Sequence, residues 1–218
     1  IKFVNEIAKR INNDPEVNEI IKVVFVQNYN VSKAELLFPA ADVSEQISTA
    51  GMEASGTGNM KFMMNGALTL GTMDGANIEI SEKAGLENIY IFGATVEELE
   101  RIKPSYNPYW QYENVKGLKR VVDSLVDGTF HDDDSGIFRD LYNSLLSGTS
   151  WEKGDTYYVL GDFEDYRRVK DQVAEDYKDK ENWNRKCWIN ICTSGHFSSD
   201  RTIREYATEI WKIDPIKL

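Results

Sequence analysis

The sequence has little positive charge and no long apolar run. Lys and Arg together number 25, against 36 Asp and Glu, and the formal net charge at pH 7 is -11. A nucleic-acid-binding protein needs a basic face to neutralise phosphates, so this balance argues against that class. No apolar stretch approaches the length that spans a bilayer, and we expect no membrane segment.

Cysteine and histidine are also scarce. Cys187 and Cys192 lie five positions apart, which matches neither a redox pair nor a zinc spacing. We expect both thiols to be reduced and packed, as in a cytoplasmic protein. His131 and His196 are far apart in the sequence, so we expect neither a metal site nor a serine-hydrolase triad. The acidic run 132–134 fits a solvated loop better than a cation site.

The start of the chain shows no signal-peptide pattern and no Met. Apolar residues recur there at helical spacing over residues 1–11, before the helix-breaking stretch Asn12–Pro15. A chain that opens directly on a helix suggests a piece of a longer protein.

Short apolar runs in the first half predict strands. The run at 20–26 is rich in Ile and Val and is typical of a buried strand. Further strands are predicted at 42–44, 68–71 and 88–92. Strands that alternate with helices through Gly-rich turns favour a parallel α/β sheet.

Capping residues predict where the intervening helices begin. Ser32 with Glu35, and Thr95 with Glu98, each form the spacing of a capping box. A short helix is also predicted to begin near Asn59, after a glycine-rich loop.

The second half has the character of a helical region. Apolar residues at helical spacing predict amphipathic helices at 118–126, 138–146, 166–177 and 203–211. Ser199 and Asp200 are candidate caps for the last of them. The fold class is therefore α/β, with a sheet-bearing first half and a helical second half.

The chemistry of the chain is concentrated in residues 53–65, which read E-A-S-G-T-G-N-M-K-F-M-M-N. Gly56 and Gly58 allow close backbone approach and positive φ, and Thr57 adds a hydroxyl group. A helix that begins after them would direct unpaired N–H groups at one spot, which forms a phosphate cradle. Lys61 follows in the first turn. A phosphate cradle beside an amine suits a ligand with a phosphate and an aldehyde, such as pyridoxal phosphate.

The same local pattern is also compatible with an ordinary turn and a solvated lysine, because Gly-x-Gly followed by lysine is common. Met60, Phe62, Met63 and Met64 fit a packed core better than a substrate surface.

A longer comparison of motifs is more specific. Residues 53–61 with Asn65 resemble the pyridoxal-phosphate attachment signature of the α-glucan phosphorylases, the family of glycogen, starch and maltodextrin phosphorylases. Both flanks, 40–51 and 65–77, resemble the same family, and so does the F-S-S-D-R-T-I stretch at 197–203. The resemblance covers essentially the whole chain.

The resemblance implies roles for individual residues around the cofactor. Lys61 would carry pyridoxal 5'-phosphate covalently. Thr57 and Gly58 would donate hydrogen bonds to its phosphate, and Tyr29 would lie beside it. Some family members have an arginine after this tyrosine, but here the residue is Asn30, so we expect no cationic contact there.

The resemblance also implies a sugar pocket next to the cofactor. Glu53, Ala54, Ser55 and Gly56 would line the pocket that holds the glucosyl unit. The Glu53 carboxylate would accept hydrogen bonds from sugar hydroxyls.

The implied architecture is the C-terminal part of a two-domain Rossmann-like glycosyltransferase fold of the GT-B type. Residues 1–115 would form the later part of the pyridoxal-phosphate-binding domain. Residues 116–218 would form a C-terminal helical region that ends in a crossover helix.

The implied activity is that of an α-1,4-glucan phosphorylase. The enzyme would release glucose 1-phosphate from glucan chain ends by retaining phosphorolysis, with α-1,4-glucan and inorganic phosphate as substrates. It would be a homodimer at full length. The family's basic phosphate-binding residues and its other domain lie upstream, so we expect this chain alone to be inactive.

Two other classes are open from the sequence. One is a glycosyltransferase of the same fold that uses a nucleotide sugar and would not need Lys61 in this motif. The other is a non-catalytic binding module, for which the sequence offers no positive feature. The preference among glycogen, starch and maltodextrin cannot be read from these residues, and neither can allosteric or phosphorylation control.

Overall fold

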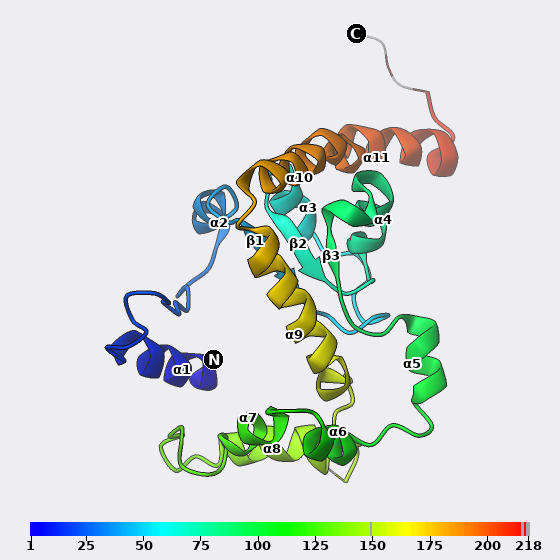
Figure 1. Cartoon of the computed structure of the whole chain (residues 1–218). Helices are drawn as coiled ribbons and strands as arrows, with labels where there is room; N and C mark the ends of the chain where they lie inside the picture. The colour runs from blue at the N-terminus through cyan, green and yellow to red at the C-terminus, as the bar shows by residue number, and fades with distance from the viewer. Residues whose placement is uncertain (149, 215, 217–218) are drawn as a thin grey trace. The chain divides into compact units, whose positions relative to one another are not determined.

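The computed structural model describes residues 1–148, 150–214 and 216 (Figure 1). It is a mixed α/β structure in which a small parallel sheet comes early and helices make up most of the rest. The elements in chain order are α1 (Lys2–Asn13), α2 (Val31–Leu37), β1 (Val43–Gln46), α3 (Gly58–Met64), β2 (Leu68–Gly71), α4 (Ala76–Ala84), the 3₁₀ helix η1 (Leu86–Asn88), β3 (Tyr90–Ile91), α5 (Val96–Ile102), α6 (Pro108–Asn114), α7 (Leu118–Asp123), α8 (Ile137–Leu146), α9 (Val159–Asp176), α10 (Lys180–Thr193), the 3₁₀ helix η2 (Ser194–Phe197), α11 (Ser199–Glu205) and the π-helix η3 (Tyr206–Trp211).

The chain divides into two compact units that interleave in sequence. Unit 1 comprises residues 1–33 and 102–164, and unit 2 comprises residues 34–101 and 165–218. The predicted domain division between residues 115 and 116 concerns the complete protein and stays a prediction. None of the described helices has the length and apolar character of a membrane span.

The sheet lies in unit 2 and is parallel, as predicted. Its strand order is β1-β2-β3, with Val43 opposite Leu68 and Leu70 opposite Tyr90. All four residues of the central strand β2 are buried, which is typical of a strand covered on both faces. Helix α3 connects β1 to β2, and α4 with η1 connects β2 to β3.

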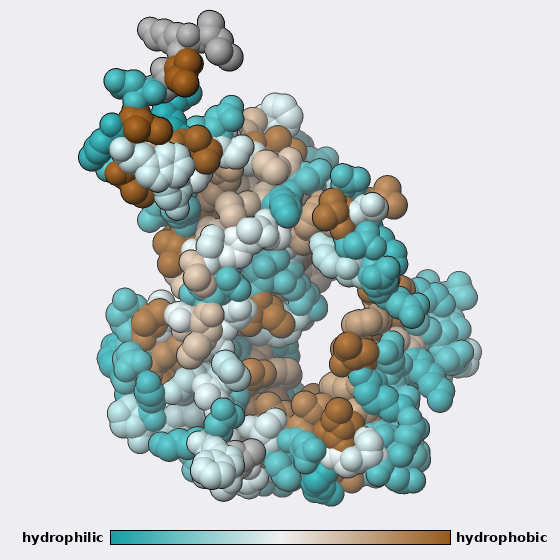
Figure 2. Space-filling model, turned by 180° about the vertical axis from the view of Figure 1, so that it is seen from behind, coloured by the Kyte–Doolittle hydropathy of each residue, from teal (hydrophilic) through white to brown (hydrophobic). Residues whose placement is uncertain are grey.

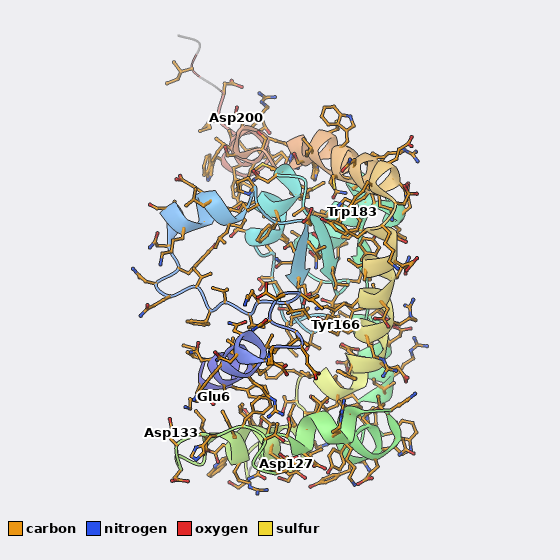
Figure 3. The ribbon with its side chains drawn as sticks, turned by 60° about the vertical axis from the view of Figure 1, so that its left-hand side comes forward. Glu6, Asp127, Asp133, Tyr166, Trp183 and Asp200 are labelled. Atoms are coloured by element: carbon orange, nitrogen blue, oxygen red, sulfur yellow. The ribbon has the colours of Figure 1, made fainter. Side chains whose placement is uncertain are left out.

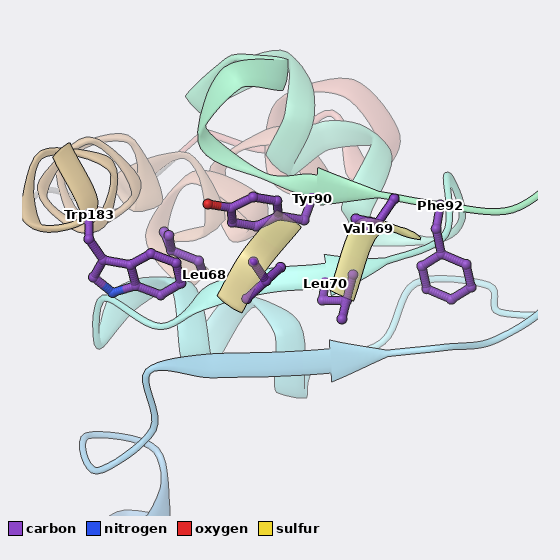
Figure 4. Close-up of a cluster of buried hydrophobic side chains, with 7 residues drawn as sticks. Leu68, Leu70, Tyr90, Phe92, Val169 and Trp183 are labelled. Carbon is purple, nitrogen blue, oxygen red and sulfur yellow. The ribbon is translucent and has the colours of Figure 1, made fainter. Parts of the chain in front are cut away.

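The largest apolar cluster of unit 2 joins the sheet to α9 and α10 (Figure 4). Trp183 on α10 is 2% exposed, and its ring stacks on that of Tyr90 with 6.1 Å between the centroids. Burying such aromatic side chains stabilises the fold by about 25 cal/mol per Å² of apolar surface. The cluster comprises Leu68, Leu70, Tyr90, Phe92, Val169, Val173 and Trp183.

Polar contacts reinforce the attachment of α9 to the sheet. The Tyr166 hydroxyl donates to Glu45 across 2.8 Å, and the Lys170 amine donates to the same carboxylate across 2.7 Å. Tyr166 and Trp183, labelled in Figure 3, belong to the two helices that cover this cluster. The end of β1 is thereby tied to α9 as well as to β2.

Unit 1 is built mainly from helices around a second core. Its apolar cluster comprises Tyr112, Val115, Leu118, Val122, Leu146 and Leu160. The Lys2 amine pairs with Glu6 at 3.1 Å and with Asp133 at 2.6 Å, and both acids are labelled in Figure 3. These two carboxylates raise the pKa of Lys2.

The predicted strand at 20–26 is wrong. The stretch is a turn followed by irregular backbone, and Ile20 and Val24 are 80% and 74% exposed. The Asn12 side chain supplies the reason, because its amide oxygen accepts the Val23 N–H at 2.9 Å and its amide nitrogen donates to the Val23 carbonyl at 2.8 Å. A side chain therefore satisfies both backbone groups that a neighbouring strand would have paired.

The predicted caps gave mixed results. Thr95 and Glu98 do form a capping box, with reciprocal hydrogen bonds of 2.9 and 3.3 Å. The Ser32 box is wrong, because α2 already begins at Val31 and the Asn30 side chain accepts the Lys33 N–H at 3.3 Å. The last helix is capped one residue earlier than predicted.

That last cap is Ser198, whose hydroxyl accepts the Asp200 N–H at 3.2 Å. The four helices predicted in the second half are confirmed, with α11 and η3 together forming the last. Helix α10 was not predicted, because its apolar residues follow no clear helical stripe. Figure 2 shows brown apolar side chains at the surface of the final segment, where Ile203 and Ile210 are 57% and 63% exposed.

The cysteines are free, as predicted, but only one is packed. Cys187 is half-buried against the sheet cluster, whereas Cys192 is exposed. The expectation that both would be packed is therefore wrong for Cys192, which lies on the outward face of α10.

Candidate functional site

A polar cavity opens at the carboxyl ends of β1 and β2. It has a volume of about 280 Å³. Ligands in open parallel sheets bind at this edge, because the loops after the strands converge there. The cavity is lined by Glu45, Gln46, Ile47, Ser48, Glu53, Asn59, Thr72, Asp74 and Asn77.

The loop that carries Glu53 is fixed by a buried aspartate. Asp74 is 6% exposed, and its carboxylate accepts the backbone N–H groups of Gly51, Met52 and Glu53 at 2.9, 3.2 and 2.8 Å. Backbone donors compensate the buried charge, so the carboxylate needs no cation. The side chain of Glu53 itself is exposed and faces the cavity.

The glycine-rich turn has part of the predicted cradle geometry. Gly56 has a φ of +79°, as its positive-φ role requires, whereas Gly58 has no positive φ and is the first residue of α3. The Met60 N–H donates to the Asn59 side-chain oxygen and the Lys61 N–H to the Thr57 carbonyl. No described residue accepts from the N–H groups of Gly58 and Asn59, which stay available to an anion.

Lys61 lies on α3 with its side chain exposed. Its amine sits 5.9 Å from the centre of the Phe38 ring, and Phe38 meets Phe62 edge to face at 4.5 Å between centroids. Lys61 is not among the residues that line the cavity. Asn59, two positions earlier, does line the cavity. Residues two positions apart on a helix differ by about 200° in direction, so Asn59 and Lys61 lie on opposite faces of α3.

A pair of asparagines connects the lysine helix to the next helix. The Asn59 amide nitrogen donates to the Asn77 side-chain oxygen, and the Asn77 amide nitrogen donates to the Thr72 carbonyl at 3.0 Å. Both asparagines are 3% exposed. Gly71 lies beside this network, and a Cβ atom there would come within 2.7 Å of the Asn77 amide nitrogen.

The cavity is acidic. Glu45, Glu53 and Asp74 contribute carboxylates, and no described lysine or arginine lines it. Lys170 and Tyr166 already bind Glu45, and the backbone already satisfies Asp74. Glu53 accepts only the Ser55 N–H from the described residues, at 3.4 Å on one oxygen, so it is the carboxylate with acceptor capacity left for a ligand. The cavity therefore suits hydroxyl donors such as a sugar better than an anion.

The structure brings together only some of the predicted site residues. Glu53 lines the cavity, whereas Ala54 and Ser55 are exposed outside its lining. Thr57 and Gly58 form the start of the helix that carries Lys61. Tyr29 belongs to unit 1 and is 59% exposed.

Sequence reasoning missed seven polar residues of the cavity: Glu45, Gln46, Ser48, Asn59, Thr72, Asp74 and Asn77. The last three stand in the T-M-D-G-A-N stretch after β2, which was noted only as a matching flank. Their position directly after a buried strand could have assigned them to the site.

Known proteins resemble the chain over nearly its whole length. The model of the phosphorylase family, described as carbohydrate phosphorylase, matches residues 1–213. The chain belongs to the carbohydrate phosphorylase family. It is 51% identical over 217 residues to a glycogen phosphorylase of Synechocystis sp., with 99% of this chain and 25% of that protein covered.

Mammalian phosphorylases are similarly close to the chain. The muscle-form glycogen phosphorylase of Mus musculus is 48% identical over 216 residues, which covers 99% of this chain and 25% of that protein. The brain form of Homo sapiens is 48% identical over 219 residues, which covers 100% and 25%. This phosphorylase chain thus spans about a quarter of the length of the relatives it matches.

Proposed function

We propose that the chain is the part of an α-1,4-glucan phosphorylase that holds pyridoxal 5'-phosphate and the terminal glucosyl unit. The observation that carries this proposal is the pairing of an acidic hydroxyl-accepting cavity with an exposed lysine on adjoining elements. Glu53 faces the cavity, and Lys61 stands eight residues later on the helix whose Asn59 lines the same cavity.

The residues around Lys61 fit the cofactor. The amine is exposed, and the N–H groups of Gly58 and Asn59 at the start of the helix have no described acceptor. A Cβ atom at Gly58 would meet nothing closer than 3.9 Å, so no neighbouring atom crowds the first residue of the helix. When bound, pyridoxal phosphate supplies a phosphate group that can exchange a proton with the substrate phosphate.

The chain's own residues would anchor and orient in this reaction. Lys61 would hold the cofactor covalently, Thr57 and Gly58 would bind its phosphate, and Tyr29 would lie beside it. Glu53 would accept hydrogen bonds from the glucosyl hydroxyls, with Ala54, Ser55 and Gly56 shaping the same pocket. The carboxylates of the cavity would repel the substrate phosphate, which would therefore bind on the side of the cofactor.

The remainder of the enzyme would supply what this chain lacks. Inorganic phosphate needs cations, and no described lysine or arginine lines the cavity. We expect these cations, and the glucan-facing domain of a GT-B type fold, in the upstream portion of the protein. Residues 1–115 would then belong to the cofactor domain and 116–218 to the helical region, in a homodimer at full length.

Trapping the cofactor tests the proposal. The purified chain and the complete protein are incubated with pyridoxal phosphate, reduced with borohydride, digested and mapped by mass spectrometry. We expect one cofactor per chain at Lys61 in the complete protein, with exposed Lys83 on α4 as the internal control for non-specific labelling. Labelling of the complete protein that is scattered over surface lysines, or absent, would refute the assignment.

Activity of the isolated chain is a separate question. We expect no glucose 1-phosphate from glucan and inorganic phosphate, because no described lysine or arginine lines the cavity. Measurable release by this chain alone would show that its own residues bind the substrate phosphate.

A further inference from the structure

The turn after β2 has a role that the cofactor and sugar assignments leave unexplained. Asp74 collects three consecutive backbone N–H groups, those of Gly51, Met52 and Glu53. At the other end of the same loop, the Ala76 N–H donates to the Ser55 carbonyl across 2.7 Å. Four hydrogen bonds therefore hold the 51–55 loop against the 74–76 turn.

The turn and the loop are too close for other residues at the join. Gly75 has a φ of +52°, and a Cβ atom there would lie 2.6 Å from the Ser55 carbonyl oxygen. Only glycine avoids both the backbone strain and the collision. The contact between loop and turn is thus built into the backbone of both segments.

Apart from a hydrogen bond of 3.0 Å from the Met52 N–H to the Thr49 carbonyl, the loop has few other contacts to order it. Met52 is 59% exposed, and Glu53, Ala54 and Ser55 are also exposed. Apolar burial therefore contributes little to its conformation. The hydrogen bonds of the loop must offset the conformational entropy that is lost when these residues are fixed. A loop of this kind takes its shape from the acceptor that collects its N–H groups.

We propose that Asp74 is a positioning residue, which holds the loop in the conformation that lets Glu53 bind sugar hydroxyls. The inference rests on the proposed function of Glu53 and adds the residue through which that carboxylate acts. Asp74 suits this task because a carboxylate offers two acceptor oxygens and no donor. One oxygen accepts from Gly51, and the other accepts from Met52 and Glu53.

An amide in place of the carboxylate would disturb this arrangement at one point. Asp74→Asn keeps the size of the side chain but replaces one acceptor oxygen with an NH₂ group, which is a donor. This donor would face backbone N–H groups about 3 Å away. The loop would then occupy its sugar-binding conformation for only a fraction of the time. The apparent affinity for a sugar falls by that same fraction, so a population of about one tenth weakens binding tenfold.

The experiment uses the complete enzyme and D-glucose as the probe of the pocket. The inhibition constant for glucose and the amount of bound cofactor are measured for the wild type and for Asp74→Asn. We expect the inhibition constant to rise about tenfold or more while one cofactor per chain is retained. An unchanged inhibition constant, or a parallel loss of cofactor that shows a general structural role, would overturn the proposal.

The matched control is Asp155→Asn. Asp155 is also buried, at 4% exposed, and accepts the N–H groups of Val159 and Leu160 at 2.8 Å each, but it belongs to unit 1. Its substitution should leave the glucose inhibition constant within about twofold of the wild type. A wild type that takes up cofactor at Lys61 but is not inhibited by glucose would refute the sugar pocket, a result distinct from a failure at Asp74 alone.

Hydrogen exchange on the wild type decides the matter if Asp74→Asn does not fold. The proposal requires the amides of Gly51 and Glu53, which Asp74 accepts, to exchange at least about tenfold more slowly than that of Ala54, which has no acceptor in the described chain. The Met52 amide is left out of the comparison because it also donates to the Thr49 carbonyl at 3.0 Å. Equal exchange rates along the loop would show that Asp74 does not hold it.

Discussion

The side-chain amide of Asn59 donates a hydrogen bond to the side-chain oxygen of Asn77 across 3.1 Å, and the two residues come from α3 and α4. Asn59 stands two positions before Lys61, and Asn77 three positions after Asp74. One buried amide pair therefore links the helix that carries the proposed cofactor lysine to the turn that holds the 51–55 loop. We expect the geometry of the site to depend on this link.

Replacing Asn77 should destabilise unit 2. Asn77→Ala removes the buried hydrogen bond that the Asn59 amide donates and the one that the Thr72 carbonyl accepts, which costs about 1–3 kcal/mol in all. The Asn59 amide keeps only a 3.5 Å bond to the Ser55 carbonyl, and the Thr72 carbonyl keeps the Asp74 N–H at 2.9 Å. Urea-induced unfolding measures the change. The control is Asn114→Ala, since Asn114 makes a similar 2.8 Å bond to the Trp110 carbonyl but is exposed. A loss at Asn77 no larger than that at Asn114 would contradict the importance of the pair.

Replacement by alanine should destabilise the protein at Gly71 but have little effect at Gly195. A Cβ atom at Gly71 would lie 2.7 Å from both the Asn77 amide nitrogen and the Gln46 carbonyl oxygen, whereas one at Gly195 would meet nothing within 4 Å. We expect Gly71→Ala to lower the free energy of unfolding by about 1–3 kcal/mol, because the packed site must shift. Gly195→Ala should change it by less than about 0.5 kcal/mol. Equal effects in thermal unfolding would show that the close contact at Gly71 can relax.

Lys61→Ala should lose the bound cofactor while its folded structure is retained. The cofactor absorbance of the complete protein, measured before and after dialysis, should fall to near zero because the remaining phosphate contacts are non-covalent. Circular dichroism should be unchanged, since the Lys61 side chain is exposed. Lys83→Ala removes another exposed lysine and should retain the cofactor. Tight retention by the Lys61 variant would refute the anchoring role.

The two cysteines should differ in reactivity. Burial raises the pKa of the Cys187 thiol, which packs against the sheet cluster, whereas Cys192 is exposed. The thiolate is the reactive form, so Cys187 should react with iodoacetamide at pH 8 about tenfold or more slowly than Cys192. Raising the pH should narrow the difference, because the Cys187 thiolate then becomes populated. Mass spectrometry of digests taken over time gives both rates. In Cys192→Ser only the slow reaction of Cys187 should remain.

Local patterns predicted those parts of the fold that neighbouring residues decide. The strands at 42–44 and 68–71, the capping box at Thr95 and the helices of the second half follow from short-range sequence signals, and the structure confirms them. The run at 20–26 has the composition of a strand but not its structure. Its backbone partner is the side chain of Asn12, and composition carries no information about such a partner.

The sequence by itself determined the family to which the chain belongs. The order of residues from Glu53 to Lys61, the glycine at the positive-φ position 56 and the excess of acidic residues can all be read directly from the sequence. Only the tertiary structure decided that Asp74 and Asn77 belong to the same site. Parallel strands bring the residues after β1 and after β2 to one edge of the sheet, and hydrogen bonds between residues about twenty positions apart then define the loop.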